Sequence, residues 1–450
     1  MLEREISTLR DLLNTYSWLQ QLAGILPLSA LIDFLDVPHA LHVFELTGCI
    51  PLWCWPVTPS GSRLLLSPHT TEEPCCLDKF GNSQSLICLD GRYGDMYNAA
   101  SPETLRLCLD SAPRTLVVND HQNMLDNHPR PQNLTVVHVS GLDSAGGSRS
   151  SWTLLGASTI GWILLLGLIV TTIALKCYIS AAFLLVIPAT GTIVYITRGG
   201  DPPTLRVTRG SNYNRLVIAA LHMNETDWLA FYGEATIVNA LLNLPLRMKR
   251  FSRANHWVFG VSLRLLVLGQ WALAIGAAST QSWDAYIITF WIVLCIFSNI
   301  FVFSTHRCCG DWLRKSAGFR LIRIETKLSS RRALLNTLVA LNPDTIPYDS
   351  VTMQDKQDGP FPSSLLWMDP ILKNCAERAI WEEATWMAMT TKPDSKEHAN
   401  KDENSNKDET EKPDWSKNYM QYYWCKFIPE GILMADKIRK AGNLSGRFVK

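Results

Sequence analysis

The sequence predicts an α-helical membrane protein with four transmembrane helices arranged as two hairpins, a small α/β N-terminal region and a mostly helical C-terminal region. Two observations lead to this fold class. Of the 450 residues, 47% are hydrophobic and only 18% are charged, whereas about 25% of the residues in a soluble domain are charged. The apolar residues also gather in four runs, each as long as the roughly 20 residues that a helix needs to cross a bilayer.

The four apolar runs come in two pairs. Trp152–Leu175 and Cys177–Thr197 are separated by a single lysine, and Trp257–Ala278 and Asp284–Ser304 are joined by a short uncharged connector. Because a short connector brings the second helix back beside the first, each pair predicts a tight transmembrane hairpin.

A shorter apolar stretch, Leu22–Leu35, precedes the four runs. It is interrupted by Pro27 and has polar residues at its edges. We therefore expect a soluble or interfacial helix here rather than a span. The residues before it mix acidic and basic side chains, which is not the pattern of a signal peptide.

Lysine and arginine residues predict the orientation, because basic residues near span ends stay on the cytosolic side. The two short turns inside the hairpins hold a single lysine. The connector between the hairpins and the segment after the second hairpin hold many basic residues: Arg198, Arg206, Arg209, Arg215, Arg247, Lys249, Arg250, Arg253, Arg307, Arg314, Lys315, Arg320 and Arg323. This distribution predicts a multi-pass membrane protein with the N-terminus, the central connector and the C-terminus all in the cytosol.

The composition divides the chain into eight regions. They are a soluble α/β region (1–139), a Ser/Gly linker (140–151), the first hairpin (152–197), a cytosolic connector (198–256), the second hairpin (257–304), a cytosolic helical region (305–391), a disordered charged tract (392–412) and a C-terminal helix and tail (413–450). The tract 392–412 is placed in the disordered class because it is rich in charge and poor in apolar residues.

Within the soluble regions, β-branched runs and capping residues predict individual elements. Strands are expected at Leu86–Leu89, Thr115–Val118, Leu134–Val139 and Arg215–His222, and helices at Ser101–Asp110, Gly233–Leu244, Ser330–Leu341, Asp369–Met389 and about Glu430–Ala441. We expect Gly233–Leu244 to be an amphipathic helix on the membrane face. We expect Asp311–Leu328, which mixes bulky apolar and basic residues, to be a helix at an anionic bilayer surface.

Charge and cysteine content exclude several function classes. The formal net charge is only +1, so no global field would attract nucleic acid. The 12 cysteines show neither a disulfide framework nor zinc-binding spacing, and we expect free thiols in the reducing cytosol. We predict no metal and no cofactor. The glycine-rich stretch Asp90–Asp95 is expected to be a turn.

One cluster of polar residues could carry catalysis. His222, Glu225 and Asp227 follow a predicted strand, where a histidine and two carboxylates could act as acid and base. With Arg264 of the third span, they would form a site at the cytosolic mouth of the bundle. The alternative is a purely structural role, with a polar loop in which Asn224 caps the next helix. Arg264 would then extend its side chain toward the membrane surface and form a hydrogen bond with Asn299.

Two kinds of covalent modification are also suggested. The adjacent Cys308 and Cys309 lie just cytosolic of the fourth span, where S-acylation occurs; the alternative is unmodified thiols. Asn133, Asn224 and Asn443 each begin a glycosylation sequon and would carry sugar only if the topology were inverted.

Three strings of sequence carry a resemblance: Leu221–Glu234, Leu341–Asp344 and Trp367–Pro370. Read together, they resemble a group of multi-pass membrane proteins of filamentous fungi that have no assigned reaction. The resemblance implies a fungal endomembrane or plasma-membrane protein and carries no functional residues over to this chain. Because some such proteins accompany natural-product pathways, it also implies a possible role as an accessory pathway component.

No motif identifies a reaction, so the functional hypotheses rest on architecture. The first is a non-enzymatic membrane-bound scaffold or accessory factor. The alternative is a membrane-tethered enzyme acting on a lipophilic substrate. A small transporter is third, disfavoured by the apolar interior of the spans. The expected partners are the lipid bilayer and proteins on the cytosolic face, and the oligomeric state is left open.

Overall fold

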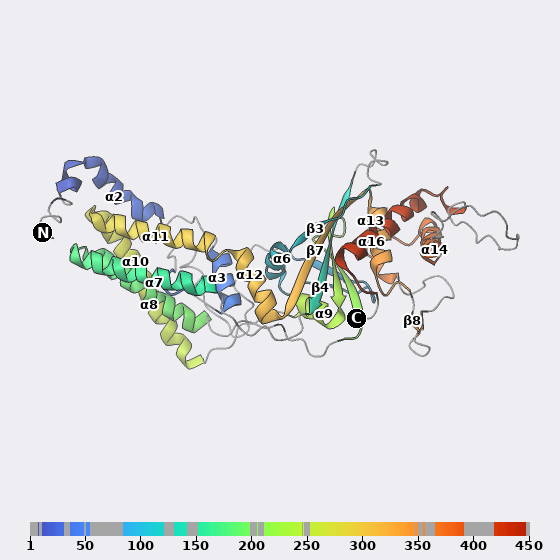
Figure 1. Ribbon diagram of the computed structural model, residues 1–450, viewed down its shortest axis with the longest axis horizontal. Helices are drawn as coiled ribbons and strands as arrows, with labels where there is room; N and C mark the ends of the chain where they lie inside the picture. The colour runs from blue at the N-terminus through green and yellow to red at the C-terminus, as the bar shows by residue number, and fades with distance from the viewer. Residues whose placement is uncertain are drawn as a thin grey trace, which may run out of the picture.

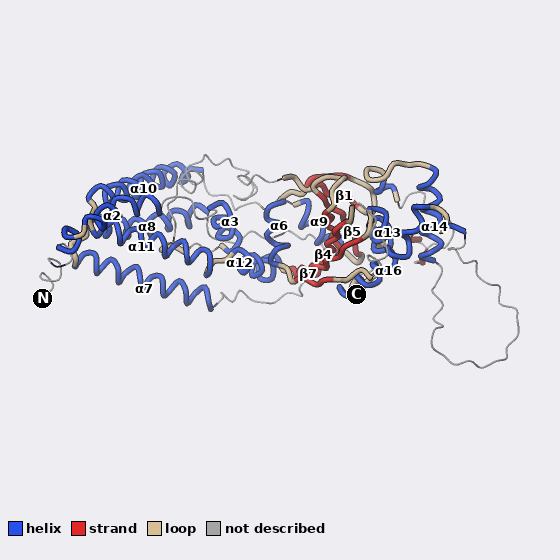
Figure 2. Tube along the Cα trace, turned by 90° about the horizontal axis from the view of Figure 1, so that it is seen from above, coloured by secondary structure: helices blue, strands red, loops and turns tan. Residues whose placement is uncertain are grey.

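The computed structural model is elongated, with a helical bundle at one end and a β-sheet domain at the other (Figures 1 and 2). It describes residues 8, 11–30, 37–48, 51–54, 84–120, 130–141, 152–198, 205, 211–244, 246, 253–346, 348–349, 354–355, 365–390 and 418–446. The predicted disordered tract 392–412 lies outside these residues, as does most of the linker 140–151.

The bundle contains four helices that are long and apolar enough to cross a membrane. They are α7 (Trp152–Ala174), α8 (Tyr178–Arg198), α10 (Arg253–Thr280) and α11 (Trp283–Phe301). Each pair is joined by a short turn at the end of the bundle away from the sheet. This arrangement agrees with the two predicted hairpins.

The sheet domain is built on one seven-stranded mixed sheet with the strand order β2-β1-β5-β6-β4-β7-β3. In that order the strands are Met96–Asn98, Ile87–Asp90, Asn214–Ala220, Asp227–Glu234, Gln132–Gly141, Phe319–Leu328 and Arg114–Leu116. A separate two-stranded ribbon pairs β8 (Tyr348–Asp349) with β9 (Gln354–Asp355).

Three separate segments of the chain supply the seven strands. The segment before the first hairpin gives β1 to β4, the segment between the hairpins gives β5 and β6, and the segment after the second hairpin gives β7. The central strand β4 pairs in parallel with β6 and antiparallel with β7. Because one hydrogen-bonded sheet joins all three segments, they lie together at the same end of the bundle.

Helices cover both faces of the sheet. On one face, the apolar core includes residues of α13 (Arg331–Leu341), α14 (Ala376–Thr390) and α16 (Ile428–Gly442). On the other face it includes residues of α6 (Pro102–Ser111), α9 (Ala235–Asn243) and α12 (Thr305–Trp312). Helix α12 continues into a π-helical turn, η2 (Leu313–Ala317); two 3₁₀ turns, η3 (Leu366–Met368) and η4 (Tyr423–Phe427), pack with the C-terminal helices.

The predicted surface helix Asp311–Leu328 is wrong over most of its length. Helical structure ends before Gly318, which has a left-handed φ of 73°, a conformation that commonly terminates helices. The chain then forms strand β7, whose Leu321 and Ile324 are buried on opposite faces of the sheet. A strand fits because successive side chains alternate between faces.

Two further predictions are corrected by the packing. The apolar face of α9, which was expected to contact the membrane, packs in protein instead: Ile237, Val238 and Leu241 are buried in the sheet domain. The predicted soluble unit 1–139 also divides, because its first part packs on the bundle. Helices α2 (Ser17–Ala30) and α3 (Val37–Thr47) place Ala23 and Phe44 in the apolar core of the bundle.

Candidate functional site

The proposed catalytic residues do not come together. His222, Glu225 and Asp227 lie on or beside the turn between β5 and β6, with His222 and Asp227 exposed. Strand β6 then runs toward the bundle, and Gly233 lies six residues beyond Asp227, which is about 20 Å along a strand. Arg264 belongs to α10 and is exposed on the bundle surface. The trio is therefore at the end of the sheet far from Arg264.

Hydrogen bonds hold the β5–β6 turn in place. Arg331 donates to the side-chain oxygen of Asn224 at 2.9 Å, and Arg130 donates to its backbone oxygen at 2.6 Å. Asn133 donates to Asp227 at 2.7 Å. Asn224 caps no helix, because the next element is strand β6. The geometry is that of a polar turn tied to the neighbouring segments.

The buried amides of Asn299 and Gln270 donate hydrogen bonds within the bundle. Asn299 does not pair with Arg264 as expected; its amide donates to the carbonyl of Cys295 at 2.9 Å and to the sulfur of Cys54 at 3.4 Å. Gln270 of α10 is buried and donates to the hydroxyl of Thr190 on α8 at 2.6 Å. Gln270 therefore links two helices and is enclosed by packing.

Cys308 and Cys309 are both buried in α12. Burial, and to a lesser extent the neighbouring Cys308, raise the pKa of the Cys309 thiol to about 12. A thiol must be accessible and partly ionised to react readily. The folded chain therefore does not offer this pair for S-acylation, which corrects the interpretation drawn from their position next to a span.

The three sequon asparagines all lie on the sheet domain. Asn133 is in β4, Asn224 is in the β5–β6 turn, Asn443 follows α16, and all three side chains are exposed. Because they belong to one folded unit, they must report the same side of a membrane.

The most extensive buried contact between bundle and sheet domain is formed by α3 and α12. Val43 and Leu46 of α3 share an apolar core with Trp312 of α12 and with the sheet. The Oγ1 of Thr104, on α6, lies 2.9 Å from the Nε2 of His42, and both residues are buried. This junction joins the two parts of the molecule through side chains rather than through linkers alone.

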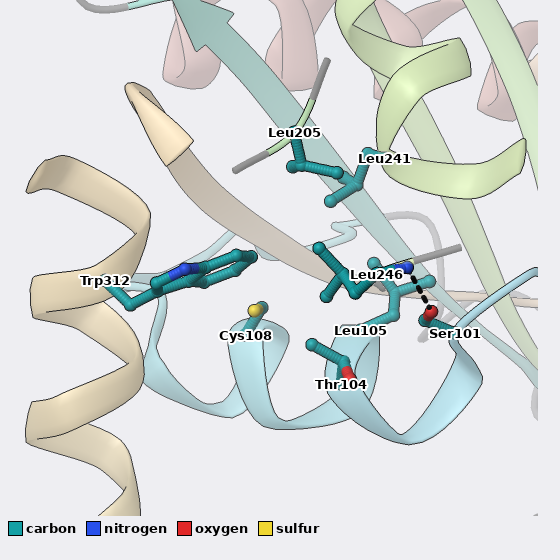
Figure 3. Close-up of a pocket in the computed structure, with 8 residues that line it drawn as sticks. All are labelled: Ser101, Thr104, Leu105, Cys108, Leu205, Leu241, Leu246 and Trp312. Carbon is teal, nitrogen blue, oxygen red and sulfur yellow. Dashed lines mark hydrogen bonds between the residues drawn. The ribbon is translucent and has the colours of Figure 1, made fainter. Parts of the chain in front are cut away.

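A small apolar cavity, hardly larger than a water molecule, lies beside this junction, between α6, α9 and α12. Trp312 and Cys108 approach it from α12 and α6, and Leu241 approaches it from α9 (Figure 3). The hydroxyl of Ser101 accepts a hydrogen bond from the backbone N–H of Leu246 at 3.3 Å. Ser101 therefore does not cap the following helix with its side chain. The cavity is a packing gap rather than a ligand site.

Two buried carboxylates, which the sequence did not indicate to be buried, hold parts of the sheet domain together. Asp90 is buried and accepts from the Nε of Arg215 at 2.8 Å, with a second contact from the same guanidinium. Its segment Asp90–Asp95 forms the turn between β1 and β2, as predicted. Glu430, at the start of α16, is also buried and accepts from the amide of Asn119 at 2.6 Å. Both carboxylates bind other parts of the sheet domain.

One apolar feature of the sheet domain stays exposed. Strand β3 lies at the edge of the sheet, and among the described residues it pairs only with β7. Leu116 is 72% exposed and Val118 is 64% exposed, while Val117 between them is buried. An edge strand with apolar side chains is a template for pairing with another extended chain.

Comparison with known proteins returns no match, either to a family model, to a curated protein or to a solved structure. Within the described ranges, no group of three or more His, Cys, Asp and Glu side chains is arranged to hold a metal ion.

Proposed function

We propose that the chain is an integral membrane scaffold that holds one soluble domain firmly against the end of a helical bundle. The shared core at the α3–α12 junction is the observation that carries this proposal. A linker alone would let the sheet domain move freely, whereas the buried Val43, Leu46 and Trp312 fix its position. A fixed domain can present a partner at a defined orientation to the bilayer.

Four-span topology fits this arrangement. Each hairpin returns the chain to the side that it left, so the three segments that build the sheet would meet on one side of the bilayer. The basic residues of the connector and of the segment after the second hairpin favour the cytosolic side.

The partner would be a protein that contributes an extended segment to the edge of the sheet. Strand β3 has a hydrogen-bonded neighbour on one side, β7, and exposes Leu116, while Val118 follows it with a carbonyl that accepts from Lys437 at 3.2 Å. Added strands gain affinity from main-chain hydrogen bonds along such an edge. Specificity would come from the alternating side chains of the added strand.

The test compares Leu116→Lys combined with Val118→Lys against a control on β2 at the opposite edge of the sheet, Met96→Lys, which changes another exposed apolar residue. Each variant is purified in mild detergent from cells that contain the natural partners. We expect a defined complex with the wild type and with the control, and the bare chain with the double variant. A double variant that retains the complex, or a wild type that forms none, would contradict the proposal.

The enzyme hypothesis has a separate test. The scaffold proposal predicts that His222→Ala and Glu225→Ala restore the phenotype of a deletion strain as well as the wild type does. Loss of function in either variant, at normal abundance and membrane insertion, would favour catalysis at the β5–β6 turn.

A further inference from the structure

The N-terminal segment follows the bundle from its far end to the sheet. At the far end, the hydroxyl of Tyr286 donates to the carbonyl of Leu19 at 2.8 Å. Gly24 packs on the turn between α10 and α11, where a Cβ atom would lie 3.3 Å from the side chain of Gln281. Figures 1 and 2 place the start of α2 at this end, opposite the sheet domain.

The same segment reaches the sheet end of the bundle shortly afterwards in sequence. The ring of Phe44 contacts that of Phe303 edge-on, with 5.8 Å between centroids. Tyr286 and Phe303 are 17 positions apart, which corresponds to about 26 Å at the roughly 1.5 Å rise of a helical residue. The segment therefore covers a length close to the ~30 Å hydrocarbon core of a bilayer.

The outer face of α2 has the character of the lipid-facing side of a span. Four apolar side chains recur along it at helical spacing, and 39–62% of each is exposed: Trp18, Leu22, Ile25 and Leu28. The uncharged Gln21 is exposed among them. The inner face, with Ala23 and Pro27, is buried against the bundle. The sequence has no Asp, Glu, Lys or Arg from Leu12 to Ile32, and Asp33 and Asp36 are the first charged residues that follow.

A helix at the membrane surface would show water a polar or charged face. Helix α2 instead exposes mainly uncharged side chains, and its neighbours α10 and α11 also expose apolar ones, Leu268 and Phe290 among them. The fitting partner for such a surface is the acyl chain of a lipid.

We infer that the chain crosses the membrane a fifth time between Leu19 and Phe44, that the outer face of α2 contacts lipid, and that the start of α2 lies on the side opposite the sheet domain. An odd number of crossings separates the two termini. This inference replaces the expectation that both termini are cytosolic and that Leu22–Leu35 is soluble or interfacial.

The test uses glycosylation of the full chain, because sugar is added only on the lumenal side. The three natural sequons are removed by Asn133→Gln, Asn224→Gln and Asn443→Gln. One acceptor sequon on a flexible spacer is then added before Met1 in one protein and after Lys450 in another. We expect only one of the two proteins to shift on a gel, and the N-terminal one if the sheet is cytosolic. A shift in both, or in neither, overturns the inference.

A pair of charge variants tests the lipid contact. Leu22→Lys combined with Ile25→Lys places two charges on the outer face of α2, while Asn14→Lys adds a charge at an exposed position before it. We expect the double variant to move the N-terminal acceptor to the same side as the C-terminal one, and the control to leave it in place. An unchanged double variant contradicts lipid contact.

The same glycosylation experiment distinguishes a failure of this inference from a failure of the proposed function. Restoring Asn133 or Asn224 singly reports the side of the sheet domain, and the scaffold proposal requires both to agree with the C-terminal acceptor. If the acceptors in the sheet domain and at the C-terminus report one side, and the N-terminal acceptor reports that same side, only the fifth crossing is refuted.

Discussion

Replacing the buried Glu430 should destabilise the sheet domain by several kcal/mol. Its Oε1 accepts from the amide of Asn119 at 2.6 Å and from the backbone N–H of Ser329 at 2.9 Å, and its Oε2 accepts from the hydroxyl of Ser329. These contacts connect α16 to the residues that follow β3 and β7. Glu430→Leu removes the acceptors but leaves the donors buried.

The magnitude follows from these three contacts. A buried donor without a partner costs about 1–3 kcal/mol. Asn119 keeps a second acceptor, the carbonyl of Lys327 at 3.1 Å, so the backbone N–H of Ser329 carries the largest loss. We expect a decrease of about 3–5 kcal/mol in the free energy of unfolding. Glu430→Gln keeps an oxygen for both N–H donors and should cost about 1 kcal/mol.

The assay is thermal unfolding of the detergent-purified chain, followed by the loss of its monodisperse peak on size exclusion. One kcal/mol shifts the midpoint of a domain of this size by roughly 2–4 °C, so Glu430→Leu should lower it by about 10 °C. Asp436→Asn, on the exposed side of the same helix, is the control and should change little. Equal midpoints for Glu430→Leu and Glu430→Gln would refute the reasoning.

Three further predictions concern the same domain. Gly431→Val should lower the unfolding midpoint and reduce expression, because its side chain would collide with Asn336 on α13; an unchanged midpoint would show that the two helices do not pack this closely. Asp90→Ala should cost about 3–5 kcal/mol by leaving Arg215 without its buried partner, measured by the same unfolding assay, and a cost below about 1 kcal/mol would count against this ion pair. With the three cysteines outside the described residues changed to serine, maleimide should label one thiol per native chain, Cys375, since the other described cysteines are buried; mass spectrometry of the intact protein counts the labels, and rapid labelling of several sites would contradict the packing.

The transmembrane helices were predictable because composition alone determines them. A long uncharged run such as that of α7 has few soluble alternatives. Strands β1, β4 and β5 were also predictable, because local runs of β-branched residues favour them. Strand β7 was missed since its arginines and lysine suggested a basic surface helix, although Gly318 and the alternation that follows it indicated a turn into a strand.

Strand pairing could not be predicted in this way. The neighbours of β4 lie about a hundred or more positions further along the chain, and their register depends on contacts between all three segments. The same dependence on residues far away in sequence explains why the candidate site was misjudged. Asn224 looked like a cap or part of a catalytic loop because Arg130 and Arg331, which hold it, are far away in sequence.

The central claim is that segments on either side of both hairpins form one sheet, and a cysteine pair tests it directly in intact membranes. Asn133 and Lys327 face each other across β4 and β7, and both are exposed. Opposite residues on antiparallel strands have Cα atoms about 4.5–5.5 Å apart, which a disulfide can bridge. Arg320 pairs with Ser140, about 23 Å along the strand from Lys327.

The measurement is oxidative cross-linking of the chain that carries Asn133→Cys and Lys327→Cys, with Asn133→Cys and Arg320→Cys as the matched control. After proteolysis between the hairpins, the fragments of the first protein should remain joined until a reductant is added, and those of the control should separate at once. Separation in both proteins would mean that β4 and β7 are not neighbours and that the three segments do not share a sheet.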